Sequence, residues 1–135
     1  MRDNYTILLA DDDPDDQELI VHAFAEVSPS FNLQIVNDGR EAIEFLSATS
    51  DSKLPCLIVL DYNMPELNGA EVLQKLTCNK RYENIPKIIL STSGNPTYVR
   101  DCLFKGANAY KVKPDNFADL VVLAKEMLEL CSKAA

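Results

Sequence analysis

The sequence predicts a doubly wound α/β fold in which helices cover both faces of a five-stranded parallel sheet. Five short apolar runs alternate with five helical patterns along its 135 residues. Several of the runs are almost continuous isoleucine, leucine and valine, which is typical of strands buried on both faces of a parallel sheet. The connections are short, and this regular alternation is the pattern of an open α/β sheet.

Each expected strand is only four or five residues long. In chain order the strands are residues 6–10, 33–36, 56–60, 87–91 and 109–112.

Around these strands, apolar residues recur every three or four positions, which is the spacing of a helix that buries one face. The pattern is weakest before the last strand, where it consists of Val99, Cys102 and Leu103, and clearest at the end of the chain. In chain order, the other four stripes are Leu19, Ile20, Ala23, Phe24 and Val27; Ala42, Ile43 and Leu46; Val72, Leu73 and Leu76; and Phe117, Leu120, Val121, Ala124, Met127, Leu128 and Cys131. We expect each stripe to pack on the sheet.

Length and composition, with 47% hydrophobic and 25% charged residues, fit one globular domain. No apolar run approaches the roughly 18 residues that a membrane-spanning helix needs. The first residues, MRDNY, lack the apolar core of a secretory signal, so we expect a cytoplasmic protein. Only three residues follow Ser132, so we expect residues 1–135 to form one domain without an output domain.

The net charge of −8, from 21 acidic and 13 basic residues, disfavours binding to nucleic acid or to an anionic membrane surface. The four cysteines, Cys56, Cys78, Cys102 and Cys131, form neither a C-x-x-C pair nor a zinc-ligand spacing. Each lies within or beside an apolar stretch, so we expect all four to be buried thiols that pack as small hydrophobic residues.

Polar residues gather where the expected strands end. In an open α/β sheet the carboxyl ends of the strands lie along one edge, where chemistry usually takes place. Although these residues are far apart in sequence, we expect their side chains to converge. They are Asp11, Asp12 and Asp13 after the first strand, Asp61 after the third, Ser91 and Thr92 at the end of the fourth, and Lys113 after the fifth.

This set of side chains suits phosphoryl transfer. Neighbouring carboxylates repel one another unless a cation lies among them, and Mg²⁺ prefers one or two carboxylates together with other oxygens and waters. A carboxylate can also accept a phosphoryl group, which gives an acyl phosphate. The protein must then position that group and neutralise charge on its oxygens, for which a metal, a lysine and a hydroxyl are well suited. Asp12 with Asp61, Lys113 and Ser91 supplies each part once.

Four segments, in order and with matching spacing, resemble the receiver domains of two-component response regulators. They are LLADDDP at residues 8–14, LDYNMP at 60–65 with Gly69, PKIILST at 86–92 and GANAYKVKP at 106–114. The resemblance spans the whole chain and implies a flavodoxin-like fold with strand order 2-1-3-4-5.

The resemblance implies that Asp61 is the phosphoacceptor and that the metal is Mg²⁺, with Mn²⁺ as an alternative. Asp12 matches the direct metal ligand, and Asp11 matches the residue that holds a metal-bound water. Asn63 matches the residue whose backbone carbonyl coordinates the metal, to which Asp61 is also a ligand.

The same resemblance assigns the switch. Ser91 matches the hydroxyl, and Tyr110 the aromatic ring, that move after phosphorylation, although Tyr110 could instead pack on the sheet edge. Lys113 matches the lysine that pairs with the phosphoryl oxygens, and Thr92 the residue whose backbone amide often contacts them. The bond between Lys113 and Pro114 matches one that is usually cis, an isomer that costs little only before proline.

The family implies a phosphorylatable switch that receives its phosphoryl group from a sensor histidine kinase or a histidine phosphotransfer protein. Its catalysis would be limited to its own phosphorylation and dephosphorylation, so we do not expect an enzyme in the usual sense. Residues 13–16, 47–55 and 81–86 resemble stand-alone regulators that are often paired with phytochrome-type or other sensor kinases. Two residues depart from the family pattern: Ser91 replaces the commoner threonine, and Tyr62 places an aromatic ring beside the site.

Several residues have structural explanations that compete with functional ones. Asp13 precedes Pro14 in the pattern of a helix N-cap, so we expect it to cap the first helix rather than bind metal. Asp15 and Asp16 suit the dipole of the first helical turn. His22 lies between residues of the first apolar stripe, and we expect it to face solvent rather than carry phosphate.

An aspartate-nucleophile phosphohydrolase is the main alternative function, since such enzymes also place an aspartate at a strand end. They usually have a second acid two residues after the nucleophile, where this chain has Asn63. Their nucleophile usually follows the first strand, whereas Asp61 follows the third, and we find no cap domain for substrate selection. A receiver-like protein that only binds other proteins is a further alternative, which the complete set of site residues disfavours.

The fourth helix, the fifth strand and the fifth helix are the expected output surface. Phe104 and Val122 fall off the apolar stripes of their helices, so we expect them to be exposed. A self-complementary patch of this kind favours an isologous dimer. The charged residues that could pair around it are Lys105, Lys111, Asp115 and Asp119.

Overall fold

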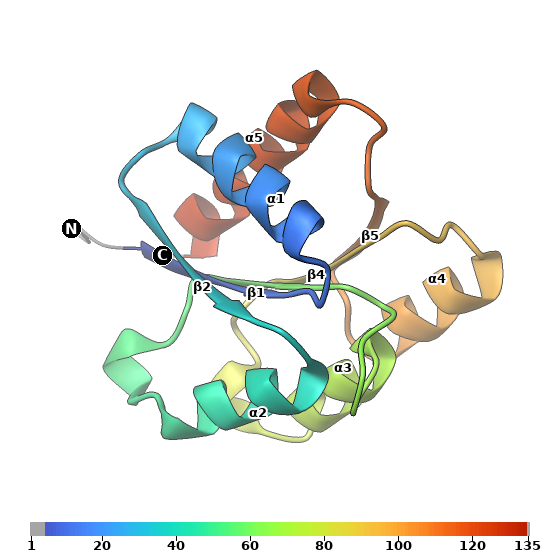
Figure 1. Ribbon diagram of the computed structural model, residues 1–135. Helices are drawn as coiled ribbons and strands as arrows, with labels where there is room; N and C mark the ends of the chain where they lie inside the picture. The colour runs from blue at the N-terminus through green and yellow to red at the C-terminus, as the bar shows by residue number, and fades with distance from the viewer. Residues whose placement is uncertain (1–4, 135) are drawn as a thin grey trace.

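The computed structural model describes residues 5–134 and contains one sheet with helices on both of its faces (Figure 1). The strands are β1 Tyr5–Ala10, β2 Phe31–Val36, β3 Leu57–Leu60, β4 Lys87–Ser91 and β5 Ala109–Val112. The helices are α1 Pro14–Val27, α2 Gly39–Ala48, α3 Gly69–Thr77, α4 Pro96–Phe104 and α5 Phe117–Ala134. Two short 3₁₀ helices, η1 Asp51–Lys53 and η2 Lys80–Tyr82, precede β3 and β4.

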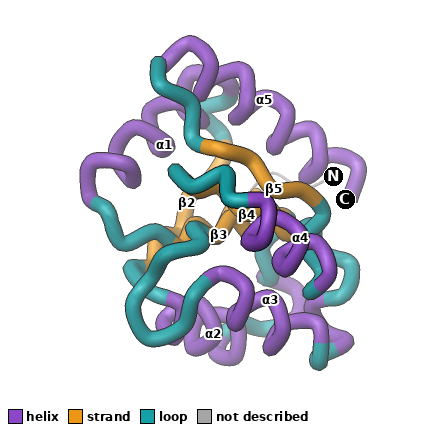
Figure 2. Tube along the Cα trace, turned by 90° about the vertical axis from the view of Figure 1, so that its right-hand side faces the viewer, coloured by secondary structure: helices purple, strands orange, loops and turns teal. Residues whose placement is uncertain are grey.

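The five strands are parallel and lie in the order β2-β1-β3-β4-β5, which confirms the predicted doubly wound sheet. The helices α1 and α5 cover one face, and α2, α3 and α4 cover the other, as Figures 1 and 2 show from two directions. Because all strands of a parallel sheet point the same way, their carboxyl ends share one edge.

The central strands separate two hydrophobic cores. Ile7 and Leu9 of β1 face the core under α1 and α5, whereas Leu8 and Ala10 face the core under α2, α3 and α4. This alternation follows from the two-residue period of a strand. All residues of β3 and β4 are buried, as their nearly continuous aliphatic sequence predicts.

Three residues predicted to pack on the sheet are instead exposed. Leu19, Leu103 and Phe117 have exposed fractions of 46%, 45% and 40%. Leu19 directly precedes Ile20, and Leu103 directly follows Cys102, and both of these neighbours are buried. Because successive residues on a helix are about 100° apart, a position next to the stripe can turn to solvent. Phe117 is the first residue of α5, where the helix has only begun.

All five helices begin after an aspartate or asparagine whose side-chain oxygen accepts a backbone N–H of the first turn. These N-caps are Asp13, Asp38, Asn68, Asn95 and Asn116. Each satisfies an N–H group that the helix itself leaves without a partner. The predicted capping role of Asp13 is confirmed, and His22 is exposed as expected.

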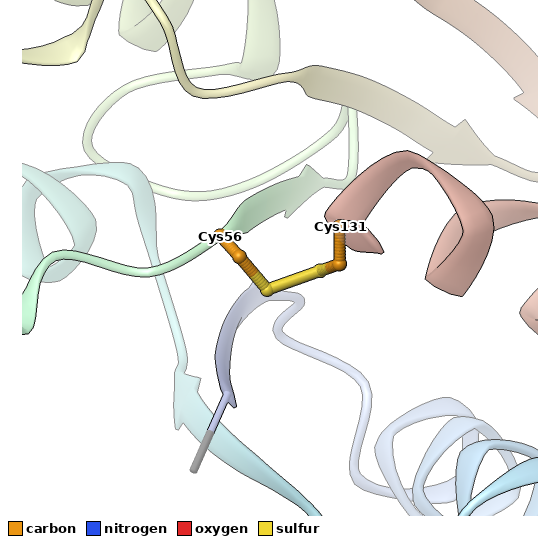
Figure 3. The surroundings of a disulfide bond; sticks show 2 residues. All are labelled: Cys56 and Cys131. Carbon is orange, nitrogen blue, oxygen red and sulfur yellow. A yellow bond between two sulfur atoms is a disulfide. The ribbon is translucent and has the colours of Figure 1, made fainter. Parts of the chain in front are cut away.

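The prediction that all four cysteines are buried thiols is wrong. Cys56 and Cys131 form a disulfide that joins the residue before β3 to α5, with Cα atoms 5.1 Å apart (Figure 3). Cys78 is exposed, and only Cys102 is a buried thiol, whose pKa burial raises to about 11. The two bonded cysteines are 75 residues apart, so no local spacing reveals the pair.

Candidate functional site

Three carboxylates meet at the carboxyl edge of the sheet, where β1 and β3 end. The backbone N–H of Asp61 donates to the Ala10 carbonyl at 2.9 Å, which continues the β1–β3 ladder past the last strand residues. Asp11 and Asp61 are buried, and Asp12 is exposed. One oxygen of each of the three carboxylates lies within 4.8 Å of the others. The predicted convergence of Asp11, Asp12 and Asp61 is therefore present.

Asp11 is the most deeply buried of the three, with an exposed fraction of 1%. Its Oδ1 accepts the backbone N–H of Asp13 at 2.9 Å. Its Oδ2 forms an ion pair with Lys113 Nζ at 2.8 Å. Burial raises the pKa of Asp11, and the neighbouring Lys113 ammonium only partly opposes that rise.

Lys113 joins the carboxylates of the site. Its Nζ lies 2.7 Å from Asp16 Oδ2 and 3.1 Å from Asp61 Oδ2, in addition to Asp11. Burial alone would lower the pKa of Lys113, but the contacts with Asp11 and Asp16 outweigh that cost and raise it. Three carboxylates therefore share a single ammonium group, and exposed Asp12 adds a fourth carboxylate beside Asp11 and Asp61, so the site has an excess of negative charge.

This arrangement suits a hard divalent cation. Mg²⁺ and Mn²⁺ take oxygen ligands, and they neutralise carboxylates that would otherwise repel one another. Apart from the Lys113 ammonium, no donor among the described residues reaches the buried Asp11 Oδ2, so a metal-bound water would find a free lone pair there. Asn63 lies on the same loop, two residues beyond Asp61, with an exposed side chain.

Ser91 ends β4 beside this edge and is completely buried. Its backbone carbonyl accepts the Lys113 N–H at 2.8 Å, and its hydroxyl accepts the Ser93 N–H at 3.3 Å. Tyr110 of β5 is half-buried, and its hydroxyl donates to the Ser93 carbonyl at 2.6 Å. The two predicted switch residues therefore contact the same residue of the β4–α4 loop, while Thr92, next to Ser91, is exposed.

The expectation of a cis bond before Pro114 is wrong, because the described residues contain no cis peptide bond. A proline lowers the cost of the cis isomer but leaves trans favoured by about 0.5–1 kcal/mol. Proline alone therefore does not specify cis.

Sequence reasoning missed two contacts at the site. Asp16 suits the dipole of the first turn of α1, but its carboxylate also forms an ion pair with Lys113. Because Asp13 is the N-cap, Asp16 occupies the third helical position. That position was the only feature of the sequence that could have indicated the contact between Asp16 and Lys113. The ring of Tyr62 stacks on Tyr98 of α4, a contact that no local pattern reveals.

The chain belongs to the response regulator receiver domain family, whose family model matches residues 7–125. It is 33% identical over 124 residues to the chemotaxis protein CheY1 of Helicobacter pylori, covering 92% of this chain and 94% of that protein.

Two solved structures of response regulators are also similar. The phosphorylated cyanobacterial phytochrome response regulator RcpA superposes with a TM-score of 0.86 at 30% identity, covering 98% of this chain and 96% of RcpA. The Mn²⁺-bound form of response regulator Rcp1 gives a TM-score of 0.79 at 30% identity, covering 90% of each chain.

The protein is thus a two-component response regulator with a flavodoxin-like fold. Members of this family are phosphorylatable switches that interact with sensor histidine kinases or phosphotransfer proteins and bind Mg²⁺ or Mn²⁺ in an acidic pocket. Among the described residues, no helix is both long and apolar enough to cross a membrane.

Proposed function

We propose that Asp61 accepts a phosphoryl group from a phosphohistidine, and that the reaction requires Mg²⁺. The observation that carries this proposal is the cluster of Asp11, Asp12 and Asp61, two of which, Asp11 and Asp61, pair with Lys113. In the reaction, an Asp61 carboxylate oxygen attacks phosphorus, the phosphorus–nitrogen bond to the histidine breaks, and an acyl phosphate forms. Water later attacks the phosphorus, the bond between phosphorus and the Asp61 oxygen breaks, and inorganic phosphate leaves, which restores the carboxylate.

We assign the direct metal ligands as Asp12, Asp61 and the backbone carbonyl of Asn63, with Asp11 holding a metal-bound water. The bound ion would neutralise charge on the phosphoryl oxygens as they approach the acidic edge. Mn²⁺ could replace Mg²⁺, since both accept carboxylate and carbonyl oxygens.

Lys113 supplies the positive charge that belongs to the protein itself. Its Nζ is 3.1 Å from Asp61 Oδ2 in the unphosphorylated protein, and its raised pKa keeps it charged at neutral pH. After transfer, we expect it to pair with a phosphoryl oxygen, with Asp11 and Asp16 holding the ammonium group in place. The Thr92 backbone amide and the Ser91 hydroxyl are the proposed donors to the remaining oxygens.

The switch would begin at Ser91. Its hydroxyl contacts Ser93 in the resting protein, and movement towards the phosphoryl group would remove that contact. The Tyr110 hydroxyl donates to the carbonyl of the same Ser93, so a change in this loop would also shift the Tyr110 ring. A local rearrangement of this kind can bias a two-state surface.

The donor we propose is a sensor histidine kinase, of the phytochrome type or another, or a histidine phosphotransfer protein. The phytochrome type is supported by the similarity to RcpA, a phytochrome response regulator. A cytoplasmic location agrees with this partner, because histidine kinases take their phosphate from ATP. The net charge of −8 argues against a nucleic-acid partner. We propose no substrate other than Asp61 itself, because Asn63 stands where a phosphohydrolase would have its second acid.

The proposed output surface is formed by α4, β5 and α5, which lie side by side in Figure 2. Phe104 and Val122 on this surface have exposed fractions of 90% and 58%. An isologous homodimer would cover them. Of the charged residues nearby, Lys105 forms an ion pair with Asp101 at 3.3 Å within α4, so Lys111 and Asp115 are the better candidates for pairing between subunits.

Intact mass after incubation with a small acyl phosphate donor tests the proposal. Wild type should gain one phosphate in the presence of Mg²⁺ and none with EDTA, and Asp61→Asn should gain none. An adduct of equal yield on Asp61→Asn, or one insensitive to EDTA, would show that the acceptor or the metal requirement is wrong.

A further inference from the structure

Two stacked tyrosine rings connect the proposed acceptor loop to α4. Tyr62 directly follows Asp61, and Tyr98 is the third residue of α4. Their ring centroids are 4.3 Å apart with an interplanar angle of 11°, and both side chains are half-buried. Nothing in the phosphoryl chemistry described above uses this contact.

The Tyr62 end of the stack is fixed to the backbone of the acceptor. The Tyr62 carbonyl accepts the Gly69 N–H at 2.9 Å, which ties the start of α3 to the end of β3. A Cβ atom at Gly69 would lie only 2.7 Å from the Asp61 carbonyl oxygen, so α3 approaches this backbone as closely as glycine allows. The Tyr62 backbone, from which the ring extends, therefore cannot shift far without moving Asp61 or α3.

The Tyr98 end belongs to a helix that is weakly anchored in the core. Cys102 is the one fully buried residue of α4, and the last two residues of the helix, Leu103 and Phe104, are exposed. The loop before α4 is held at Ser93 by the Tyr110 hydroxyl, at 2.6 Å. The aromatic side chains of Tyr62 and Tyr110 thus contribute to fastening the beginning of α4, beside half-buried Val99.

We propose that the Tyr62–Tyr98 stack holds α4 in its unphosphorylated position, so that Tyr62 is a positioning residue of the switch alongside Ser91 and Tyr110. This inference rests on the proposed phosphorylation of Asp61. If α4 moves when Asp61 is phosphorylated, Tyr98 must leave the ring of Tyr62, the residue that directly follows the acceptor. Breaking the stack then opposes activation, and a variant without the stack activates more easily.

The size of this effect follows from the strength of aromatic pairs, which changes an equilibrium by roughly 2- to 10-fold. By thermodynamic linkage, a phosphoryl mimic that favours the shifted helix should bind a stack-free variant more tightly by the same factor. Because the stack is a direct contact of α4, its loss should also be visible in the unmodified protein.

The test compares wild type with Tyr62→Leu, Tyr98→Leu, the double variant, and Tyr62→Phe as the conservative control. Hydrogen exchange of the α4 amides, measured without metal or phosphate, should become faster in all three leucine variants and stay unchanged in α2. Beryllium fluoride with Mg²⁺, a phosphoryl mimic, should bind these variants about 2- to 10-fold more tightly. Tyr62→Phe, which keeps the ring, should behave as wild type, and the double variant should add nothing to either single change.

Unchanged exchange in α4 overturns the inference. Faster exchange with unchanged or weaker mimic binding also overturns it, because the stack would then hold α4 without opposing activation. If Tyr62→Leu does not fold, Tyr98→Leu makes the same comparison from the helix side. If wild type itself fails to bind the mimic, the proposed function is wrong, whereas the exchange data still decide whether the stack holds α4.

Discussion

Two neighbouring aspartates at the end of β1 are expected to serve different purposes. Asp12 belongs to the carboxylate cluster, whereas the Asp13 side chain caps α1 through the N–H groups of Asp15 and Asp16. We predict that Asp12→Ala weakens Mg²⁺ binding by at least about tenfold, since even partners beyond the direct ligands contribute that much. Asp13→Ala should instead lower the free energy of unfolding by about 1 kcal/mol and leave affinity nearly unchanged.

Calorimetric titration with Mg²⁺ and urea unfolding of both variants measure these two effects. Equal losses of affinity in Asp12→Ala and Asp13→Ala would show that the ligand is wrongly assigned.

A buried lysine far from the acidic site gives a pH-dependent prediction. Lys87 is almost completely buried, and its Nζ donates to the backbone carbonyls of Tyr82 at 2.6 Å and Ile85 at 2.8 Å. Burial lowers the pKa of Lys87 below its ordinary value of 10.5. Between the lowered pKa and 10.5 the unfolded chain binds more protons than the folded one, so this residue's contribution to stability rises with pH.

The matched variant is Lys87→Met, which keeps the length of the side chain but cannot titrate. The free energy of unfolding of wild type, relative to Lys87→Met, should increase from pH 7 to pH 10. A difference that is constant or decreases over this range would contradict the lowered pKa.

At the site, sequence reasoning could predict residues whose position follows from the sheet. Asp11, Asp12, Asp61, Ser91 and Lys113 each end or follow a strand, and parallel strands bring their carboxyl ends to one edge. Sequence reasoning could not predict which side chains would pair with one another at that edge. The ion pair of Asp16 with Lys113 and the stack of Tyr62 on Tyr98 depend on how α1 and α4 are rotated and placed, and hydrophobic periodicity does not specify these details.

At the scale of whole elements, the disulfide joins α5 to the sheet. Cys131 belongs to the apolar stripe of α5, and Cys56 lies just before β3, at the opposite end of that strand from Asp61. The sequence predicted both elements, but it could not reveal the pair, because their contact exists only after α5 has packed on the sheet.

We predict that reduction of this bond destabilises the protein. A cross-link between residues 75 positions apart restricts the unfolded chain, and the chain-entropy account gives about 4 kcal/mol. The melting temperature should fall on reduction and in Cys131→Ser, while Cys78→Ser, which removes an exposed thiol, serves as the control and should not change it. Equal melting temperatures with and without reductant, after intact mass has verified the oxidation state, would show that the bond does not stabilise the fold.

At the scale of the whole molecule, the exposed side of α4, β5 and α5 is where we expect self-association. Phe104→Asp and Val122→Asp should each abolish the rise in mass that light scattering detects on adding beryllium fluoride and Mg²⁺, because a buried unpaired charge is costly. Leu19→Asp is the matched control: Leu19 is also an exposed aliphatic residue, but it lies on α1. If both surface variants associate as wild type does, the interface lies elsewhere.

The central claim is that the acyl phosphate forms on Asp61. Borohydride reduces an aspartyl phosphate to homoserine, so peptide mass spectrometry after phosphorylation and reduction identifies the modified position. The account predicts homoserine at residue 61 alone, only when Mg²⁺ was present, and none at Asp11 or Asp12. Homoserine at either of those positions, or none anywhere in protein that carries phosphate, would contradict it.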